Sequence, residues 1–225
     1  MTFDQAIRLL ETIALLLSAV AWPAFALIAA WTILPAVLRT MSDSDNVSVD
    51  MFGFKAAFTK QKNLAVTALV DAARAGVTGK SDTVNPTLAK DVVARAVTPT
   101  SVKKLDGRKI LWADDRPSNN SSARQAFEAL GIRFDFALNT DEAIRLLRNQ
   151  HFDLVISDMG RPPDAKAGYT LLDQLRSAGN SIPYVIYSSA GSDLENQAEA
   201  RRRGALGSTN SSNDLFQIVI TELTR

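Results

Sequence analysis

The sequence predicts an α/β protein whose C-terminal part, residues 107–225, is a doubly wound sheet of five parallel strands. The first of two observations favours this fold class, and the second predicts a membrane segment before the folded domain. Short apolar runs alternate with helical patterns from Gly107 onward, which is typical of a parallel sheet covered by helices on both faces. A long uncharged segment, Thr12–Leu38, precedes this region. We therefore expect one folded domain behind an N-terminal membrane segment.

The uncharged segment Thr12–Leu38 exceeds the roughly 20 residues that a helix needs to cross a bilayer. A buried core helix and a cleaved signal peptide are the alternatives. A core helix of this length would carry a polar face, and the acidic residues Asp4 and Glu11 before the segment are unlike a signal peptide. We predict that residues 1–40 contain a single transmembrane helix.

The basic residues around this segment predict its orientation. Arg39 follows the segment directly, and Lys55, Lys60 and Lys62 come soon after it. Positive side chains collect on the cytoplasmic side of membrane helices, whereas acidic ones count little. We expect a single-pass protein whose C-terminal domain is cytoplasmic and for which the membrane is one partner.

Two segments connect the membrane helix to the folded domain. Residues 41–78 predict a juxtamembrane segment with a strand or hairpin at 47–58 and a helix at 59–76. The apolar residues near one face of that helix are Leu64, Leu69, Val70 and Ala73. Residues 79–106 lack a sustained period and read as a linker with a short helix at 87–97. Two interpretations of the helix at 59–76 remain open. It is either a solvated spacer or an element that forms a homo-oligomer or binds a partner.

The five expected strands are short apolar runs. The first ends in two adjacent aspartates, the third is almost continuously apolar, and the fifth is short and weak. Their ranges are 109–113, 132–139, 152–157, 183–189 and 205–210. Continuous apolar runs predict strands that are buried on both faces of a sheet.

Helices fill the intervals between the strands. In the first, Ala123, Ala126, Phe127 and Leu130 recur at helical spacing, and Gly131 stops the helix. The second begins at the capping residue Thr140 and carries two acidic residues in its first turn. The remaining helices are expected at 169–179, 193–204 and 213–223.

A flavodoxin-like strand order would bring three carboxylates together. In that order the first and third strands are neighbours, and the functional crevice lies at their carboxyl ends. Asp114 and Asp115 follow the first strand, and Asp158 follows the third. Three close carboxylates need a compensating cation, and oxygen-only ligands suit Mg²⁺ or Mn²⁺. One aspartate could also attack a phosphoryl group.

The stretches ILWADDRP, FDLVISDMGRPP and IPYVIYSS resemble the strands of response-regulator receiver domains. The resemblance covers about residues 107–225. It implies Asp158 as phosphoacceptor, Ser188 as switch residue, and a Mg²⁺ site that the family forms from two acidic residues, the phosphoacceptor and a backbone carbonyl. These metal ligands map onto Asp114, Asp115, Asp158 and Gly160. It also implies a phosphodonor or another signalling protein as partner.

The sequence departs from the receiver pattern after the fifth strand. The family has a lysine there, but this stretch reads GSTNSSND, with Ser211 nearest the lysine position. Ser208 replaces the usual aromatic residue of that strand. Arg161 or Lys166 could supply the missing positive charge. The departures leave two versions of the function open, a phosphorylated receiver and a pseudo-receiver that acts by docking.

We therefore expect a membrane-anchored signalling module of a bacterial-type inner membrane rather than an enzyme. A phosphohydrolase, a TIR-like enzyme using Glu195 or Glu199, and a membrane effector are the alternatives. The chain has no cysteine and one histidine, which excludes thiol chemistry and disfavours a histidine-based zinc site or catalytic triad. A net charge of +1 without a dense basic patch disfavours nucleic-acid binding.

Overall fold

The computed structural model describes residues 54–76 and 86–225 of the chain. The expected transmembrane helix at 12–38 lies outside these residues. Within the described part, no helix combines the length and apolar character that a membrane crossing requires. All described elements except the first two residues of one helix belong to one compact unit, Ala56–Arg225.

The five predicted strands form one parallel sheet in the flavodoxin-like order β2-β1-β3-β4-β5, which confirms the predicted topology. The strands are β1 (Lys109–Ala113), β2 (Arg133–Ala137), β3 (Leu154–Ser157), β4 (Tyr184–Tyr187) and β5 (Gly207–Thr209). Each helical crossover returns the chain to the end of the sheet where the previous strand began, so all five strands run in the same direction. The carboxyl ends of β1, β3 and β4 therefore lie next to one another.

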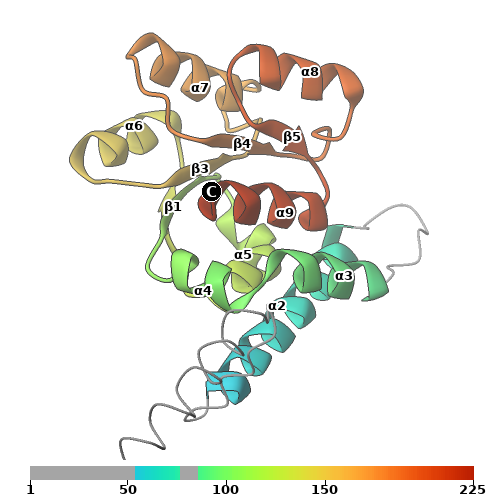
Figure 1. Ribbon diagram of the computed structural model, residues 1–225. Coiled ribbons are helices and arrows are strands. Elements are labelled where there is room, and N and C mark those ends of the chain that lie inside the picture. Colours follow the sequence, from blue (N-terminus) through green and yellow to red (C-terminus); the bar gives the residue numbers. More distant parts are fainter. Residues whose placement is uncertain (1–53, 77–85) are drawn as a thin grey trace, which may run out of the picture. The chain divides into compact units, whose positions relative to one another are not determined.

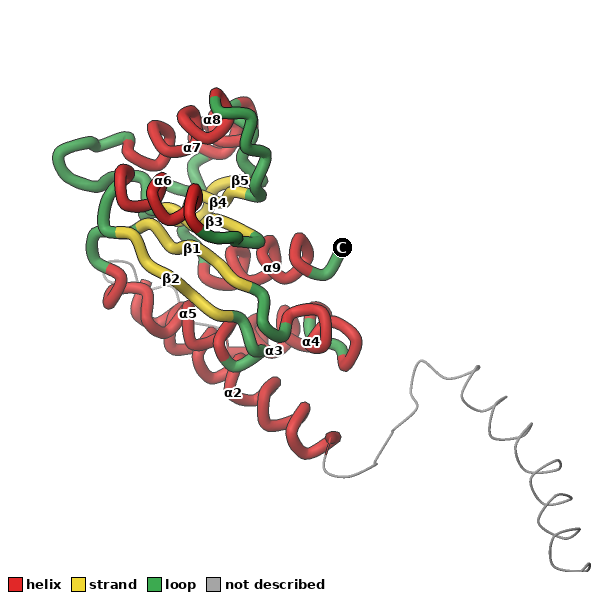
Figure 2. Tube along the Cα trace, turned by 90° about the vertical axis from the view of Figure 1, so that its left-hand side faces the viewer, coloured by secondary structure: helices red, strands yellow, loops and turns green. Residues whose placement is uncertain are grey.

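Helices cover both faces of this sheet (Figure 1). One face carries α6 (Thr140–Asn149), α7 (Ala167–Ser177) and α8 (Leu194–Arg202). The other carries α5 (Ser121–Glu128), which follows the short 3₁₀ helix η1 (Pro117–Asn120), and α9 (Ser212–Leu223). Figure 2 shows the same layers from the side.

Alternation along the strands divides the core into two clusters. In β1, Ile110 and Trp112 face α5 and α9, whereas Leu111 and Ala113 face α6 and α7. All four are at most 1% exposed. A strand that is buried on both faces must be apolar at its buried positions, which explains the continuous apolar run ILWA after Lys109.

Residues 86–105 form two helices: the short helix expected at 87–97 is confirmed, but the rest of this stretch is not the expected linker. They are α3 (Pro86–Ala96) and α4 (Pro99–Leu105), and Thr98 caps α4 with a reciprocal hydrogen-bond pair to Ser101. Their apolar residues join the core cluster that contains α9; they are Ala89, Val93, Val97, Val102 and Leu105. The period of α4 is hard to see in the sequence because this helix is short and begins at a proline.

The helix α2 (Phe54–Gly76) begins five residues earlier than predicted, so residues 54–58 are helical and do not belong to a strand. The rest of the expected strand, residues 47–53, lies outside the described residues. Leu69 and Val70 are buried as expected, but Leu64 is 50% exposed. The buried face is formed instead by the i, i+3, i+4, i+7 set Ala65, Ala68, Leu69 and Ala72.

Candidate functional site

Three carboxylates meet at the carboxyl ends of β1 and β3. The strands are paired so that Ala113 lies opposite Ser157, and the next residues along each strand are Asp114 and Asp158. Asp114, Asp115 and Asp158 each offer a carboxylate oxygen, and these oxygens lie within 4.8 Å of one another. The structure therefore brings together the three acidic residues that the sequence singled out.

Asp114 is the most rigidly held of the three. It is 3% exposed, and its two carboxylate oxygens accept hydrogen bonds from the Arg116 amide and the Asn120 side chain, both at 2.7 Å. The sequence analysis did not identify Asn120. The polar run PSNN directly after the aspartate pair was the available signal, since η1 turns this run back toward the strand end.

Asp115 and Asp158 are half-buried and belong to the same carboxylate cluster at the ends of β1 and β3. Asp115 lies 3.5 Å from Arg116 Nε, and its side chain is 24% exposed. The Oδ1 atom of Asp158 accepts a hydrogen bond of 2.8 Å from the Met159 amide. Within the described part of the chain, no hydrogen bond reaches Asp158 Oδ2, so this oxygen is free to contact a ligand.

The electrostatics of Asp158 reflect its neighbours. Burial raises the pKa of the Asp158 carboxyl, and the charges of Asp114 and Asp115 raise it further. The Met159 hydrogen bond and the charge of Arg161 act in the opposite direction, but the pKa remains above its ordinary value. A bound cation would relieve this repulsion. Because the donor set contains only oxygen atoms, it fits a hard ion such as Mg²⁺.

Gly160 and Ser188 belong to the loops that border this cluster. Gly160 follows Asp158 by two residues, in the loop that leads to α7. Ser188 directly follows β4, which is the neighbour of β3. Gly160 and Ser188 therefore both lie near the carboxyl ends of these strands, as Asp158 does. The Ser188 amide donates to the Thr209 carbonyl at 3.1 Å, which connects the β4–α8 loop with β5.

The β5–α9 loop has hydrogen-bonding side chains at the position where the resemblance leads one to expect a lysine. Ser211 caps α9 by accepting a hydrogen bond from the Asp214 amide at 3.2 Å. Asn210 bonds to Ser192 Oγ at 2.5 Å and to the Ser189 carbonyl at 3.1 Å. These contacts fasten the loop after β4 to the loop after β5, and they supply no positive charge.

The two cations that the sequence offered as substitutes lie in different environments. Lys166 is exposed, and within the described residues its side chain makes no hydrogen bond or ion pair. Arg161 is 2% exposed, and its guanidinium bonds to the Asp158 carbonyl at 2.7 Å. Nothing in the sequence indicates that this arginine is buried.

The glutamates that a TIR-like enzyme would need are not part of the carboxylate cluster. Glu199 is bound to Arg202 and Arg203 on the surface of α8, both at 2.5 Å, and these bonds lower its pKa. Glu195 is exposed in the first turn of the same helix. Within the described residues, the acidic cluster consists of aspartates only.

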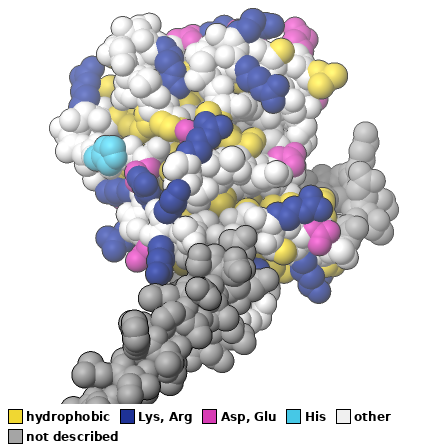
Figure 3. All heavy atoms as spheres, in the orientation of Figure 1, with side chains coloured by type: hydrophobic (Ala, Val, Ile, Leu, Met, Phe, Trp, Pro, Cys, Tyr) yellow, Lys and Arg dark blue, Asp and Glu magenta, His cyan; other side chains and the backbone are white. Residues whose placement is uncertain are grey.

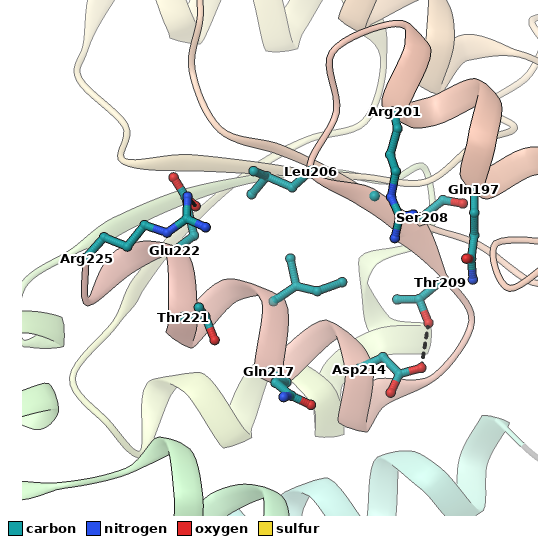
Figure 4. Close-up of a pocket in the computed structure, with 12 residues that line it drawn as sticks. Gln197, Arg201, Leu206, Ser208, Thr209, Asp214, Gln217, Thr221, Glu222 and Arg225 are labelled. Atoms are coloured by element: carbon teal, nitrogen blue, oxygen red, sulfur yellow. Dashed lines mark hydrogen bonds and ion pairs between the residues drawn. The ribbon is translucent and has the colours of Figure 1, made fainter.

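A separate hollow of about 440 Å³ lies between α8, β5 and α9 (Figure 4). Arg201 extends into it from α8, and Thr209 faces Asp214, with 3.5 Å between the hydroxyl and a carboxylate oxygen. None of the three clustered aspartates lines this hollow.

On the molecular face shown in Figure 3, lysine and arginine side chains are scattered in separate groups with acidic side chains between them.

Comparisons with known proteins identify part of this chain. Residues 110–210 match the response regulator receiver domain family. Sensor protein EvgS of Escherichia coli is 33% identical over 93 residues, which are 41% of this chain and 7% of that protein. Sensor histidine kinase RcsC of Escherichia coli is 30% identical over 88 residues, which are 39% of this chain and 9% of that protein. This chain thus matches less than a tenth of the length of either relative.

Solved structures similar to this chain cover about half of it. The Francisella response regulator 1452 receiver domain is 28% identical with a TM-score of 0.46, covering 52% of this chain and 97% of that chain. Response regulator protein TrrA from Thermotoga maritima, solved in complex with Mg(2+)-BeF, is 20% identical with a TM-score of 0.43. That similarity covers 51% of this chain and 98% of that chain.

Proposed function

From the premise that residues 110–210 are a response regulator receiver domain, we propose that this chain is a membrane-anchored signalling module with Asp158 as its phosphoacceptor. The observation that carries the proposal is the convergence of Asp114, Asp115 and Asp158 within 4.8 Å. The convergence is at the carboxyl ends of adjacent parallel strands, where α/β sheets bind their ligands.

The proposed metal site uses the residues at this edge. The carboxylates of Asp114, Asp115 and Asp158 and the carbonyl of Gly160 would hold one Mg²⁺. When bound, Mg²⁺ supplies charge neutralisation for the carboxylates and for a phosphoryl group. Asp114 is oriented by Asn120 and by the Arg116 amide, so this ligand is held in place before the ion arrives.

The proposed reaction is transfer of a phosphoryl group to Asp158. A carboxylate oxygen attacks phosphorus, a new P–O bond forms, and the bond from phosphorus to the donor breaks. With acetyl phosphate as donor, acetate leaves with the electron pair of that bond. The free Oδ2 atom is suited to the attack, because Oδ1 is engaged by the Met159 amide. The Ser188 hydroxyl would then contact the phosphoryl group and act as the switch.

Labelling of the full-length protein in detergent micelles tests this proposal. Incubation with ³²P-acetyl phosphate and Mg²⁺ should label the wild type, and EDTA should prevent labelling. Asp158→Asn should abolish labelling, whereas the control Asp135→Asn, which alters a carboxylate bound to Lys109 on the sheet surface, should retain it. Equal labelling of wild type and Asp158→Asn would show that another residue is the acceptor.

A docking pseudo-receiver is the second candidate function. It is favoured by the β5–α9 loop, where Ser211 caps a helix and no lysine is present to contact a phosphoryl group. In this case neither acetyl phosphate nor beryllofluoride, each added with Mg²⁺, would change the NMR spectrum of the protein. NMR spectra of the full-length protein recorded with and without these compounds separate the two candidates, because a phosphoacceptor should show shifts at Asp158 and Ser188.

The membrane anchor is proposed for residues 12–38, with the receiver domain on the cytoplasmic side of a bacterial-type inner membrane. Because the chain has no cysteine, single cysteines can report its topology. In spheroplasts, a membrane-impermeant maleimide should label Thr2→Cys but not Ser181→Cys. Labelling of Ser181→Cys alone would show that the protein has the opposite orientation. Recovery of the intact chain in the soluble fraction would contradict the anchor.

A further inference from the structure

Arg161 is a buried cation with an unusual set of partners. It is 2% exposed, although it follows Asp158 by three residues in a loop that borders the acidic cluster. Among the described residues, no carboxylate lies close enough to form an ion pair with it. A buried charge without a bonded counter-ion is costly, so something nearby must compensate for it.

The guanidinium is held almost entirely by backbone carbonyls and hydroxyls. Its Nη1 atom donates to Ser157 Oγ at 2.6 Å, to the Asp158 carbonyl at 2.7 Å and to the Ala113 carbonyl at 3.3 Å. Its Nη2 atom donates to the Ala167 carbonyl at 3.0 Å and to Thr140 Oγ1 at 3.3 Å. Arg161 thereby joins the ends of β1 and β3 with the first residues of α6 and α7.

These bonds place the positive charge directly behind the acidic cluster. Ala113 and Ser157 are the residues immediately before Asp114 and Asp158, and the Asp158 carbonyl is itself a partner. The three carboxylates repel one another, and Arg161 lacks a bonded carboxylate.

We propose that Arg161 is the positioning residue of the acidic site, acting as a fixed internal counter-charge for Asp114, Asp115 and Asp158. It supplies from within the protein a positive charge that the β5–α9 loop lacks. The inference rests on the proposed function, because it concerns the same site. It adds that the repulsion among the three carboxylates is partly offset before any metal binds, and that the loop bearing Asp158 is fixed by the same side chain.

A double-mutant cycle separates the charge of Arg161 from its hydrogen bonds. Arg161→Gln removes the charge but keeps an amide donor, whereas Arg161→Lys keeps the charge but loses the planar fork. Asp158→Asn removes one carboxylate and leaves the Asp158 carbonyl, the atom that Arg161 binds, in place. The full-length protein in detergent micelles is unfolded by heat at pH 8 with EDTA, so neither Mg²⁺ nor a phosphodonor takes part.

We expect Asp158→Asn to raise the unfolding temperature in every background, because it relieves repulsion among the carboxylates. The rise should be larger by about 3 °C in the Arg161→Gln background than in the wild type. In the Arg161→Lys background it should equal the wild-type value. The matched control Asp91→Asn, an exposed residue of α3, should give the same small shift in all backgrounds.

Equal shifts for Asp158→Asn in all three backgrounds would overturn the proposal, since Arg161 would then only tie backbone atoms together. If Arg161→Gln fails to fold but folds again when combined with Asp158→Asn, the proposal is supported. If the double variant also fails to fold, the proposal is rejected. Because the cycle contains no metal or phosphodonor, its outcome is independent of whether Asp158 is phosphorylated.

Discussion

Gly191 lies directly against the backbone of Thr209, so that a β-carbon at Gly191 would overlap the Thr209 carbonyl and lie 2.8 Å from its amide nitrogen. The contact holds the β4–α8 loop, which begins at the predicted switch residue Ser188, against β5. Ser208 reinforces it, because its hydroxyl donates to the Gly191 carbonyl at 2.6 Å. The loop after β4 therefore depends on a glycine for its close approach to β5.

Replacement of this glycine should destabilise the protein. We expect Gly191→Ala to lower the free energy of unfolding by about 2 kcal/mol, because the β-carbon must push the loop away from the Thr209 backbone. Gly207→Ala is the matched control, since a β-carbon there would meet only Ile218 Cδ1, at 4.0 Å. Urea denaturation measures both, and equal losses for the two variants would show that the contact with Thr209 is not the cause.

A second glycine pair tests how the loop after β3 supports the proposed metal site. A β-carbon at Gly168 would lie 2.8 Å from the Asp158 carbonyl, whereas one at Gly160 would lie at an ordinary 3.5 Å from the Ala165 carbonyl. We expect Gly168→Ala to displace the Asp158 backbone and weaken Mg²⁺ binding about 10-fold. Gly160→Ala should leave the affinity unchanged, because the proposed ligand is a backbone carbonyl. Calorimetric titration with Mg²⁺ measures both, and the reverse order would contradict this account.

The fold and the acidic cluster were predictable because both follow from local patterns. Apolar runs define the strands, and the rule that parallel strands end at a common edge brings Asp114 and Asp158 together. The burial of Arg161 was not predictable, because its partners are backbone atoms and hydroxyls distributed over four elements. Gly191 was missed for the same reason, since its constraint comes from a strand 18 residues away.

The helices α3 and α4 should contribute to stability as parts of the core. Leu105 of α4 is fully buried, and we expect Leu105→Ala to lower the free energy of unfolding by about 3 kcal/mol. Leu88 of α3 is 52% exposed, so Leu88→Ala is the matched control and should cost less than about 0.5 kcal/mol. Urea denaturation again measures both. A small effect of Leu105→Ala would mean that residues 86–105 behave as the linker that the sequence suggested.

Asp153 should make the stability of the protein depend on pH in a defined direction. Burial acts to raise the pKa of this carboxyl, but hydrogen bonds from the Lys109 amide at 2.7 Å and from Arg108 at 2.5 Å outweigh it, together with the charges of Arg108 and His151. The pKa is therefore lowered in the folded state. A lowered pKa stabilises the folded protein above the ordinary Asp value of about 3.9. This contribution is lost as the pH falls through the folded-state value.

Comparison with Asp153→Asn isolates this effect, because asparagine does not titrate and all other groups are shared. At pH 7 we expect the variant to be about 2 kcal/mol less stable, since the start of β1 loses a charged hydrogen-bond partner. The difference should persist down to about pH 5 and should shrink below about pH 4 as Asp153 is protonated. Urea denaturation across this range measures it. A difference that persists or grows toward pH 2.5 would show that the Asp153 carboxylate does not stabilise the fold through its charge.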